Sequence, residues 1–302
     1  MSSSQGMSSL QGILAASITP FDSDGRIDFD ALARHLVRLA DAGCAGVVMN
    51  AVTGEGGSLR PAERRDALRC AVDTLAGRAA VIATAGSVGD FETVEDIRAA
   101  EAIGAQGLMI LAPFFYRLTQ AERVAYFRRM GSVSDLDYIV YNTTYTSPML
   151  SLDELEAIAE VSPHFVGVKE GDQLQASEGV RRLSPRVAVY TSRDSYIAEL
   201  GFAGGAGAVT YTSNVAPELT VDLWKAVAAG DVARARALQQ KLNPLALGLV
   251  TRSFPSPIKA AMKLQGTDGG VLRTPVTGLD ATEIDRLVQI LRDLEAPLQV
   301  AS

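Results

Sequence analysis

The chain has 302 residues, of which 47% are hydrophobic and 21% charged, so it is long enough to bury a substantial core. Its 35 acidic and 28 basic residues give a net charge of −7 at pH 7, which argues against nucleic acid as a partner. Two cysteines exclude a disulfide-rich scaffold and a multi-cysteine zinc site, and two histidines far apart in sequence form no short His-based metal motif.

Residues 1–10 are polar and contain no basic residue, so they lack the charged and apolar regions of a secretory signal. We expect them to form a disordered leader. No apolar run approaches the roughly 18 residues that a membrane-spanning helix requires. The sequence therefore predicts a soluble, cytoplasmic protein without a membrane segment.

From residue 13 onward, short apolar runs alternate with longer amphipathic segments. Continuous apolar runs are typical of strands buried on both faces, and a 3.6-residue apolar period is typical of helices. The predicted strands are residues 13–18, 46–49, 80–85, 107–111, 138–141, 165–169, 187–191 and 206–210. The predicted helices among them are residues 30–40, 61–75, 92–103, 120–133, 152–161 and 215–229.

Three helix-to-strand joints, AGCAGVVM, IGAQGLMI and AGGAGAVT, each place glycine where a helix should end and a strand begin. Eight alternations predict a parallel sheet, and eight parallel strands can close into a (β/α)8 TIM barrel. A doubly wound open sheet has the same alternation and remains an alternative. We therefore predict a barrel domain over residues 11–230.

After residue 230 the strand pattern stops. Residues 232–242, 257–264 and 281–294 have the pattern of helices. No Ser/Gly linker or charge run marks an independent domain, so residues 231–302 are predicted to form a C-terminal helical extension of the barrel.

Lys169 ends a predicted buried strand, where functional residues of α/β barrels are found. By the two-residue alternation, Phe165, Gly167 and Lys169 should share one face, and Gly167 would leave space beneath the lysine. A buried lysine favours its neutral amine, which can form a Schiff base with a carbonyl substrate. The competing interpretation is that Lys169 pairs with Glu170 or with a helix end.

Tyr141 ends the preceding predicted strand, where its phenol could transfer protons during such a reaction. It could equally be a buried aromatic residue with a satisfied hydroxyl group. Residues 53–57 form a glycine-rich loop whose amides, with the Thr53 hydroxyl, could hold a carboxylate. The loop lacks the GK[ST] ending of a phosphate-binding loop, so nucleotide binding is not expected.

The positions of the cysteines and histidines give little indication of a functional role. We interpret Cys44 and Cys70 as small core residues, and Cys44 precedes a strand, on the stability face of a barrel. His35 lies within a predicted helix and His164 before a strand, both away from the catalytic rim.

Together these residues resemble the dihydrodipicolinate synthase/N-acetylneuraminate lyase family of Schiff-base barrels, from about residue 12 to residue 275. The matching motifs are Thr19-Pro20-Phe21, Thr53-Gly54-Glu55, Pro113-Phe114-Phe115, Tyr141-Asn142, Gly167-Val168-Lys169-Glu170, Pro257-Ile258-Lys259 and Arg273-Thr274-Pro275. The resemblance implies that Lys169 is the Schiff-base lysine and Tyr141 the proton-relay tyrosine. It also implies that Thr53 binds the carboxylate of a 2-oxo acid.

Three positions depart from the synthases of this family. Val52 replaces a hydroxyl residue of the usual G-[ST]-T-G-E loop, and Phe115 stands where a neighbouring subunit donates a relay tyrosine. Thr146 stands where the synthases carry an arginine for the carboxylate of the aldehyde. Tyr116, one residue after Phe115, matches the Pro-Phe-x-Tyr pattern of lyase-like members, although the loop at residues 192–195 differs from their sugar-contacting loop. These departures argue against synthase chemistry.

We therefore expect a Schiff-base-forming lyase or aldolase that acts on pyruvate or another 2-oxo acid, with an aldehyde or sugar acid as the second substrate. Three alternatives stay open: a dehydratase of a deoxy-2-oxo sugar acid using the same imine, a 4-hydroxy-tetrahydrodipicolinate synthase, and a barrel that only binds 2-oxo acids. The resemblance implies no metal or organic cofactor, because the protonated imine is itself the electron sink, and it implies a homo-oligomer, a tetramer or a dimer.

Tyr145 and Arg193 are candidates for selecting the second substrate. Tyr145 would line the mouth of the barrel, and Arg193 could bind a distal carboxylate in bidentate geometry. Alternatively, Arg193 pairs with Asp194 or Glu199 at the surface. The predicted substrate-binding residues are, in full, Val52, Thr53, Gly54, Phe115, Tyr145, Thr146, Arg193 and Thr210.

Overall fold

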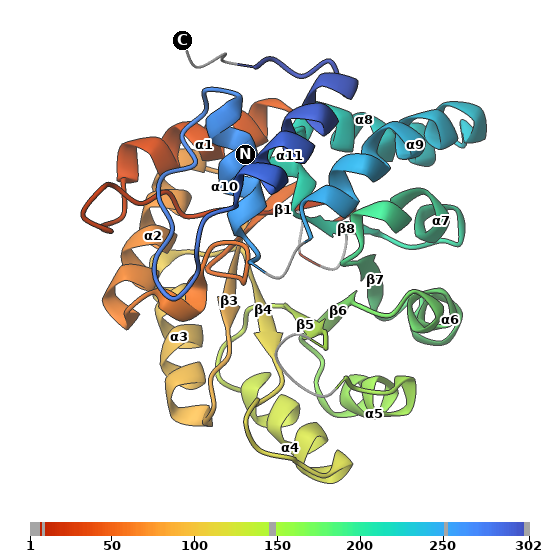
Figure 1. The fold of residues 1–302 in the computed structure, drawn as a ribbon. Coiled ribbons are helices and arrows are strands. Elements are labelled where there is room, and N and C mark those ends of the chain that lie inside the picture. Colours follow the sequence, from red (N-terminus) through yellow and green to blue (C-terminus); the bar gives the residue numbers. More distant parts are fainter. Residues whose placement is uncertain (1–6, 8–9, 145–148, 251–252, 299–302) are drawn as a thin grey trace.

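The computed structural model describes residue 7 and residues 10–144, 149–250 and 253–298. Its eight strands are β1 (Gly12–Ala16), β2 (Gly46–Met49), β3 (Ala80–Ala85), β4 (Gly107–Leu111), β5 (Tyr138–Asn142), β6 (Phe165–Glu170), β7 (Ala188–Thr191) and β8 (Gly207–Thr210). Each strand pairs in parallel with the next, and β8 pairs with β1 to close a barrel (Figure 1). This closure confirms the predicted (β/α)8 barrel and excludes the doubly wound alternative.

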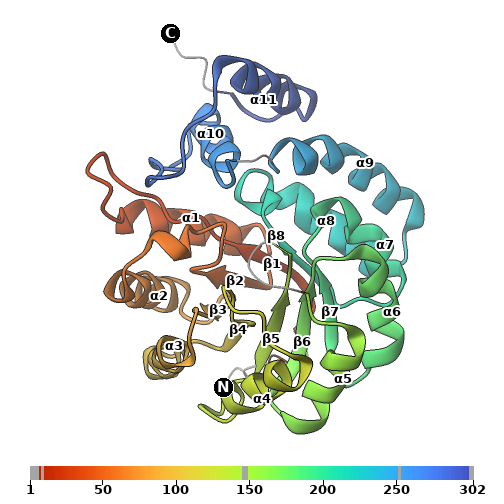
Figure 2. The same cartoon turned by 60° about the horizontal axis from the view of Figure 1, so that its bottom comes forward.

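Helices surround the barrel and continue beyond it (Figure 2). They are α1 (Phe29–Asp41), α2 (Pro61–Leu75), α3 (Asp90–Ile103), α4 (Gln120–Met130), α5 (Leu152–Val161), α6 (Gln173–Leu183), α7 (Ile197–Phe202), α8 (Pro217–Ala228), α9 (Val232–Gly248), α10 (Ser256–Leu264) and α11 (Ala281–Asp293). The last three follow the barrel, where the sequence predicts helices. No helix in the described part of the chain is both long and apolar enough to cross a bilayer.

The sequence pattern did not single out α6 and α7. Helix α6 buries Ala176, Gly179 and Leu183, and two of these side chains are too small to produce a clear apolar period. Helix α7 has only six residues, which is too short for a periodic pattern. Most of the other helices were predicted near their observed bounds because their buried faces carry larger apolar residues. The predicted end of α9 at residue 242 is wrong, because the helix continues to Gly248 with Pro244 inside it.

Side-chain caps explain where several of these helices begin. Thr119 and Ser151 accept hydrogen bonds from the backbone amides of Glu122 and Glu154, whose carboxylates bind the cap residues in return. Pro61 stands in the first turn of α2, as the sequence predicts. These local signals set the lengths of the loops that precede the helices, and those loops carry the candidate site.

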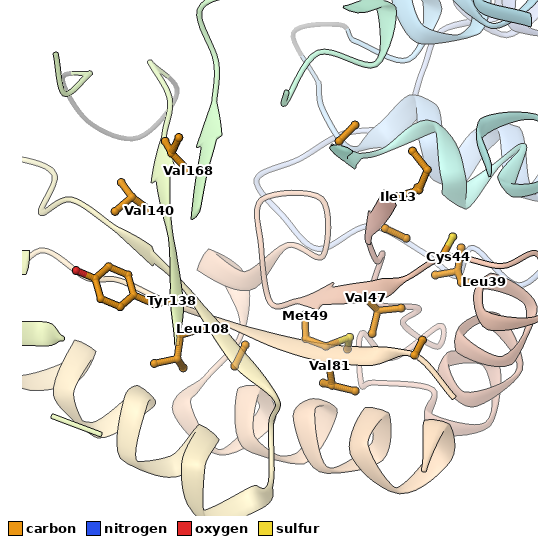
Figure 3. Close-up of a cluster of buried hydrophobic side chains, with 14 of the residues drawn as sticks. Ile13, Leu39, Cys44, Val47, Met49, Val81, Leu108, Tyr138, Val140 and Val168 are labelled. Atoms are coloured by element: carbon orange, nitrogen blue, oxygen red, sulfur yellow. The ribbon is translucent and has the colours of Figure 1, made fainter. Parts of the chain in front are cut away.

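Buried hydrophobic side chains form two layers, one inside the barrel and one between the barrel and its helices. On β2, Val48 faces the barrel interior, whereas Val47 and Met49 face the helices, as alternation along a strand requires. Figure 3 shows part of the outer layer, including Cys44. Cys44 is buried in this layer, as predicted, and burial raises the pKa of its thiol to about 12.

The disordered leader predicted for residues 1–10 is wrong for Met7 and Leu10. Both side chains are buried in the cluster inside the barrel. A Cβ on Gly107 would lie 2.6 Å from the Met7 sulfur, so the glycine makes room for this methionine. The Tyr190 hydroxyl donates a hydrogen bond to the Leu10 carbonyl. Two apolar residues among polar ones are too few to predict burial from the sequence. The contacts with β4 and β7 hold Met7 and Leu10 in place.

Candidate active site

Lys169 lies near the carboxyl end of β6 and faces the barrel interior. The predicted alternation is only partly right, because Gly167 also faces the interior but Phe165 packs in the outer layer. Two consecutive residues of β5 pair with Phe165 and Gly167, which leaves Val166 as an extra residue in β6. Such a bulge changes the direction of the side chains on one side of it.

A tyrosine flanks Lys169 on each neighbouring strand. Tyr141 on β5 and Tyr190 on β7 are its register partners. The Lys169 Nζ atom lies 3.9 Å from the centroid of the Tyr141 ring, and both of these residues are only 5% exposed. The Tyr190 hydroxyl is engaged by a backbone carbonyl at the other end of the barrel. Tyr141 is therefore the phenol placed beside the amine.

The space at Gly167 is filled. A Cβ atom at this position would lie 3.1 Å from Cε2 of Tyr190 and 3.2 Å from Cγ1 of Ile139, so either neighbour would have to move. The glycine therefore admits the Tyr190 ring below Lys169. The sequence predicted open space there, and the structure shows an aromatic floor instead.

Glu170 is directed away from Lys169. Its Oε2 atom accepts hydrogen bonds from Asn142 Nδ2 at 2.8 Å and from Gln175 Nε2 at 2.9 Å, and its Oε1 atom accepts one from the amide of Asp172 at 2.9 Å. Burial raises the pKa of Glu170 above its ordinary value, although these donors act in the opposite direction. No Lys169–Glu170 ion pair is found among the described residues, so the competing interpretation of Lys169 is wrong in this respect.

The glycine-rich loop after β2 carries Thr53 and Gly54. Thr53 is 5% exposed. The Thr19 hydroxyl donates a hydrogen bond of 2.8 Å to the Gly54 carbonyl, and a Cβ atom on Gly54 would lie 2.8 Å from the carbonyl oxygen of Ser17. The loop thus packs directly against the segment that follows β1, which keeps Thr53 at the carboxyl end of the barrel.

A pocket of about 270 Å³ lies beside Tyr141, over the carboxyl ends of β2, β3 and β4. Its wall includes Tyr141, Val52 and Phe114, and Val52 is 36% exposed. The Thr84 Oγ1 and Asn50 Oδ1 atoms on the same wall are buried without a hydrogen-bond partner among the described residues. The pocket therefore combines apolar surface with polar atoms next to the phenol.

Phe115, which the sequence predicts as a substrate-binding residue, is 85% exposed and has a left-handed φ of 83°. Its ring packs edge-to-face with that of Tyr116, with the centroids 5.5 Å apart. Tyr116 is 58% exposed. Within this chain, Phe114 lines the pocket next to Tyr141 and Phe115 does not.

Of the remaining predicted binding residues, the structure describes Thr210 and Arg193. Thr210 is fully buried near the end of β8 and hydrogen-bonds the hydroxyl of Ser213. Tyr145 and Thr146 lie outside the residues that the structure describes. Their predicted contacts with the second substrate therefore stay predictions.

Arg193 follows β7 and is partly buried. Its Nε atom donates to the Gly171 carbonyl at 3.1 Å, and its amide donates to Thr191 Oγ1 at 2.9 Å. The surface pair with Asp194 or Glu199 that the sequence offered is not among the ion pairs of the described residues. The guanidinium instead lies against the loop that follows the Lys169 strand.

In the sequence analysis, Asp194 appears only as a possible surface partner of Arg193 and not as a site residue. It is fully buried, and its Oδ2 atom accepts hydrogen bonds from Thr212 Oγ1 at 2.6 Å, the Thr212 amide at 2.7 Å and the Tyr211 amide at 3.0 Å. Burial raises the pKa of Asp194 to about 7, although these donors and the charge of Lys169 act in the opposite direction. Its Oδ1 atom has no hydrogen-bond partner in the described part of the chain. Asp194 comes just after a buried strand. Position at a strand end is the criterion that identified Lys169, and it could have identified Asp194 as well.

Metal ligands do not gather in this site. Over residues 10–144, 149–250 and 253–298, no group of three or more histidine, cysteine, aspartate or glutamate side chains is arranged to hold a metal ion. The Tyr141 ring lies beside the Lys169 amine, and the charge of Lys169 acts on the buried carboxyl group of Asp194.

Comparisons with known proteins place the chain among related sequences. The family model described as the dihydrodipicolinate synthetase family matches residues 9–294. An uncharacterized DapA-like lyase of Halobacterium salinarum is 34% identical over 292 residues, which cover 94% of each chain.

Two solved structures extend the similarity to the fold. The dihydrodipicolinate synthase of Aquifex aeolicus superposes with a TM-score of 0.92 at 28% identity, over 96% of this chain and 100% of its own. YagE, a prophage protein of the dihydrodipicolinic acid synthase family from E. coli K12 in complex with pyruvate, superposes with a TM-score of 0.90 at 26% identity, over 95% and 99%. The similarity therefore covers nearly the whole chain.

Proposed function

Because the chain belongs to the dihydrodipicolinate synthetase family, we propose that it is a Schiff-base-forming lyase that acts on pyruvate or another 2-oxo acid through Lys169. The observation that carries this proposal is the position of the Lys169 amine, buried at the barrel mouth 3.9 Å from the ring of Tyr141. The pyruvate complex of the related YagE supports the choice of substrate class.

The proposed cycle needs the neutral amine of Lys169. The amine attacks the 2-oxo carbon, and the resulting carbinolamine loses water to form an iminium ion. In cleavage, the bond that breaks joins the α carbon, next to the iminium carbon, to the β carbon. The electrons of this bond form an enamine, and the other fragment leaves as an aldehyde. Tyr141 takes and returns the protons, while Thr53 and Gly54 hold the substrate carboxylate. In synthesis, the iminium ion of pyruvate first loses a proton from its methyl carbon, and the enamine so formed attacks an aldehyde. In either direction, water finally hydrolyses the imine and frees the Lys169 amine.

Borohydride trapping tests the proposal. Incubation with pyruvate and borohydride should reduce the imine and add a stable adduct, which peptide mass spectrometry should map to Lys169. Lys169→Ala should lose both the adduct and turnover. An adduct at another lysine, such as Lys225, Lys241, Lys259 or Lys263, would refute the mechanism.

A second candidate is a 4-hydroxy-tetrahydrodipicolinate synthase, which the similarity to the Aquifex aeolicus enzyme favours. Val52 opposes it, because its side chain lines the pocket beside Tyr141 without the hydroxyl of the usual loop. Product analysis separates condensation from cleavage, and it also separates both from the dehydration of a deoxy-2-oxo sugar acid. Imine trapping without turnover of any partner would favour the binding-only barrel.

The proposal includes a homo-oligomer. The exposed rings of Phe115 and Tyr116 support it, because a second copy could cover this apolar surface. Analytical ultracentrifugation should show a dimer or a tetramer. A monomer would refute the proposed homo-oligomer. The cytoplasmic location stays a prediction from the sequence.

A further inference from the structure

The carboxylate of Glu55 joins the loop after β2 to the C-terminal extension. Lys259, on α10, places its Nζ atom 2.5 Å from Glu55 Oε1, and the two side chains are 3% and 1% exposed. The backbone amide of Arg273 donates to Glu55 Oε2 at 3.0 Å. Both oxygens of Glu55 thus contact groups of the C-terminal extension.

The ring of Phe21 and the side chain of Arg273 make further contacts around this ion pair. Lys259 Nζ also lies 4.3 Å from the centroid of the Phe21 ring, and the Arg273 guanidinium lies 4.3 Å from the same centroid. Arg273 donates further hydrogen bonds to the Ser58 carbonyl at 3.0 Å and to Glu63 Oε1 at 2.6 Å. The extension therefore contacts both the start and the end of the segment that follows Glu55.

The loop needs such support because its backbone is in an unusual conformation. Glu55 has a φ of 54°, in the left-handed region that costs free energy for a residue with a Cβ atom. A Cβ on the next residue, Gly56, would lie 1.9 Å from the carbonyl oxygen of Asn50, so the chain turns tightly there. Thr53 and Gly54 immediately precede this turn. Any change in how Glu55 is held is therefore transmitted to them.

We propose that Lys259 is a positioning residue that, through Glu55, holds Thr53 and Gly54 in the arrangement that binds the carboxylate of a 2-oxo acid. The inference rests on the proposed function, because it takes Thr53 as a carboxylate ligand. A buried ion pair fixes the position of both partners, since neither can exchange its partner for water. The C-terminal extension is then a functional part of the site.

Lys259→Met tests the role through the pyruvate dependence of borohydride trapping. A misplacement of about 1 Å can cost roughly 100-fold. We expect the pyruvate concentration for half-maximal trapping to rise roughly 10- to 100-fold, while the trapping rate at saturating pyruvate stays within about twofold. A merely structural role would lower the active fraction without moving the half-saturation concentration, and that result would overturn the proposal. The matched control is Lys263→Met, an exposed position on the same helix, which should behave as the native protein.

A second variant covers the case in which Lys259→Met fails to fold. Lys259→Met/Glu55→Gln removes both charges, so no unpaired charge is left buried. It should fold and still show the raised half-saturation concentration. A folded double variant with native half-saturation would overturn the positioning role.

Hydrogen exchange provides a measurement on the native protein. Pyruvate should protect residues 53–58 and, with them, residues 271–273, which the proposal couples to the loop through Glu55. Protection confined to residues 53–58 would overturn the coupling. The two proposals fail differently: a native protein that forms no adduct at Lys169 overturns the proposed function and this inference with it. A native adduct with unchanged half-saturation in Lys259→Met overturns the positioning role alone.

Discussion

Lys169 and Tyr141 face each other across neighbouring strands, with the lysine nitrogen 3.9 Å from the centroid of the phenol ring. The π-face of an aromatic ring attracts positive charge. The ring can therefore stabilise the iminium ion that the proposed cycle forms at this nitrogen, while the hydroxyl transfers protons. Removing only the hydroxyl separates the two roles.

Tyr141→Phe keeps the ring and removes the hydroxyl. We expect the Lys169 adduct to form still, and turnover to fall roughly 100- to 10,000-fold, which is typical of a lost general acid–base group. Adduct yield by mass spectrometry and kcat would be compared. The control is Tyr190→Phe, because Tyr190 is the other register partner of Lys169 and its hydroxyl binds the Leu10 carbonyl. Native turnover of Tyr141→Phe would exclude Tyr141 as the proton relay.

The barrel was predictable because its strands are buried on both faces and read as continuous apolar runs. The bulge at Val166 was not, since it depends on how β6 registers against β5, and it redirected Phe165 to the outer layer. The burial of Met7 also depends on a distant partner, Gly107. Local pattern thus predicted the elements, whereas contacts between distant segments decided these details.

In the candidate site, too, some residues could be predicted from local sequence and others only from contacts between distant segments. Lys169 and Tyr141 stand at strand ends and could be found from position. The ion pair of Glu55 with Lys259 joins two segments that only the folded chain brings together. No local pattern could pair these two residues, although both lie within motifs of the family resemblance.

His35 should make the protein less stable in acid. Burial lowers the pKa of His35 from 6.5 to about 4, and its Nε2 atom lies 2.9 Å from Asn214 Oδ1. The unfolded chain therefore takes up a proton near pH 6.5, which the folded chain accepts only near pH 4. The contribution of the neutral His35 to the free energy of unfolding is fully present above pH 6.5. This contribution is lost as the pH falls, and the loss reaches roughly 3 kcal/mol at pH 4.

Urea unfolding of the native protein and of His35→Gln between pH 4 and 7.5 measures this contribution. The glutamine can still donate a hydrogen bond to Asn214, and the difference in unfolding free energy between the two proteins should shrink as the pH falls. His164→Gln changes a half-buried histidine beside Asp137 and serves as the control. A difference that does not vary with pH would contradict the prediction.

Asp194 should have the opposite effect. Burial raises its pKa from 3.8 to about 7, so the folded protein keeps a proton that the unfolded chain releases near pH 4. Stability is therefore lost as the pH rises from about 4 to about 7, by roughly 4 kcal/mol. Asp194→Asn has the same shape and no charge, and it should gain stability relative to the native protein over that range. Parallel pH profiles for the two proteins would show that Asp194 titrates normally.

Condensation of pyruvate with aspartate semialdehyde should be negligible. Val52 lacks the hydroxyl of the synthases, Phe115 lacks their relay phenol, and Thr146 lacks their arginine. Lost general acid–base groups typically cost roughly 100- to 10,000-fold each, so the deficit should be easy to detect. A coupled assay for the condensation product would measure it. Efficient complementation of a strain that lacks the synthase would show this reasoning to be wrong.

Arg193 should select the second substrate. Its Nε atom donates to the Gly171 carbonyl, which fixes the guanidinium plane beside the end of β6, and the group has further donors for a carboxylate. Arg193→Ala should raise KM for an acidic partner roughly tenfold or more while pyruvate trapping at Lys169 stays native, because the proposed cycle forms the imine before the partner reacts. Arg193→Lys should restore little, since lysine cannot form the bidentate geometry.

The outcome distinguishes two roles for Arg193. If the side chain only holds Gly171, Arg193→Ala should disturb the loop after Lys169, and pyruvate trapping should weaken while KM for the partner stays unchanged. Arg181→Ala is the matched control, because Arg181 is an exposed arginine on α6 that pairs with Glu178 on the same helix. Its loss should change neither quantity. If Arg193→Ala and Arg181→Ala behave alike toward every accepted partner, Arg193 does not belong to the site.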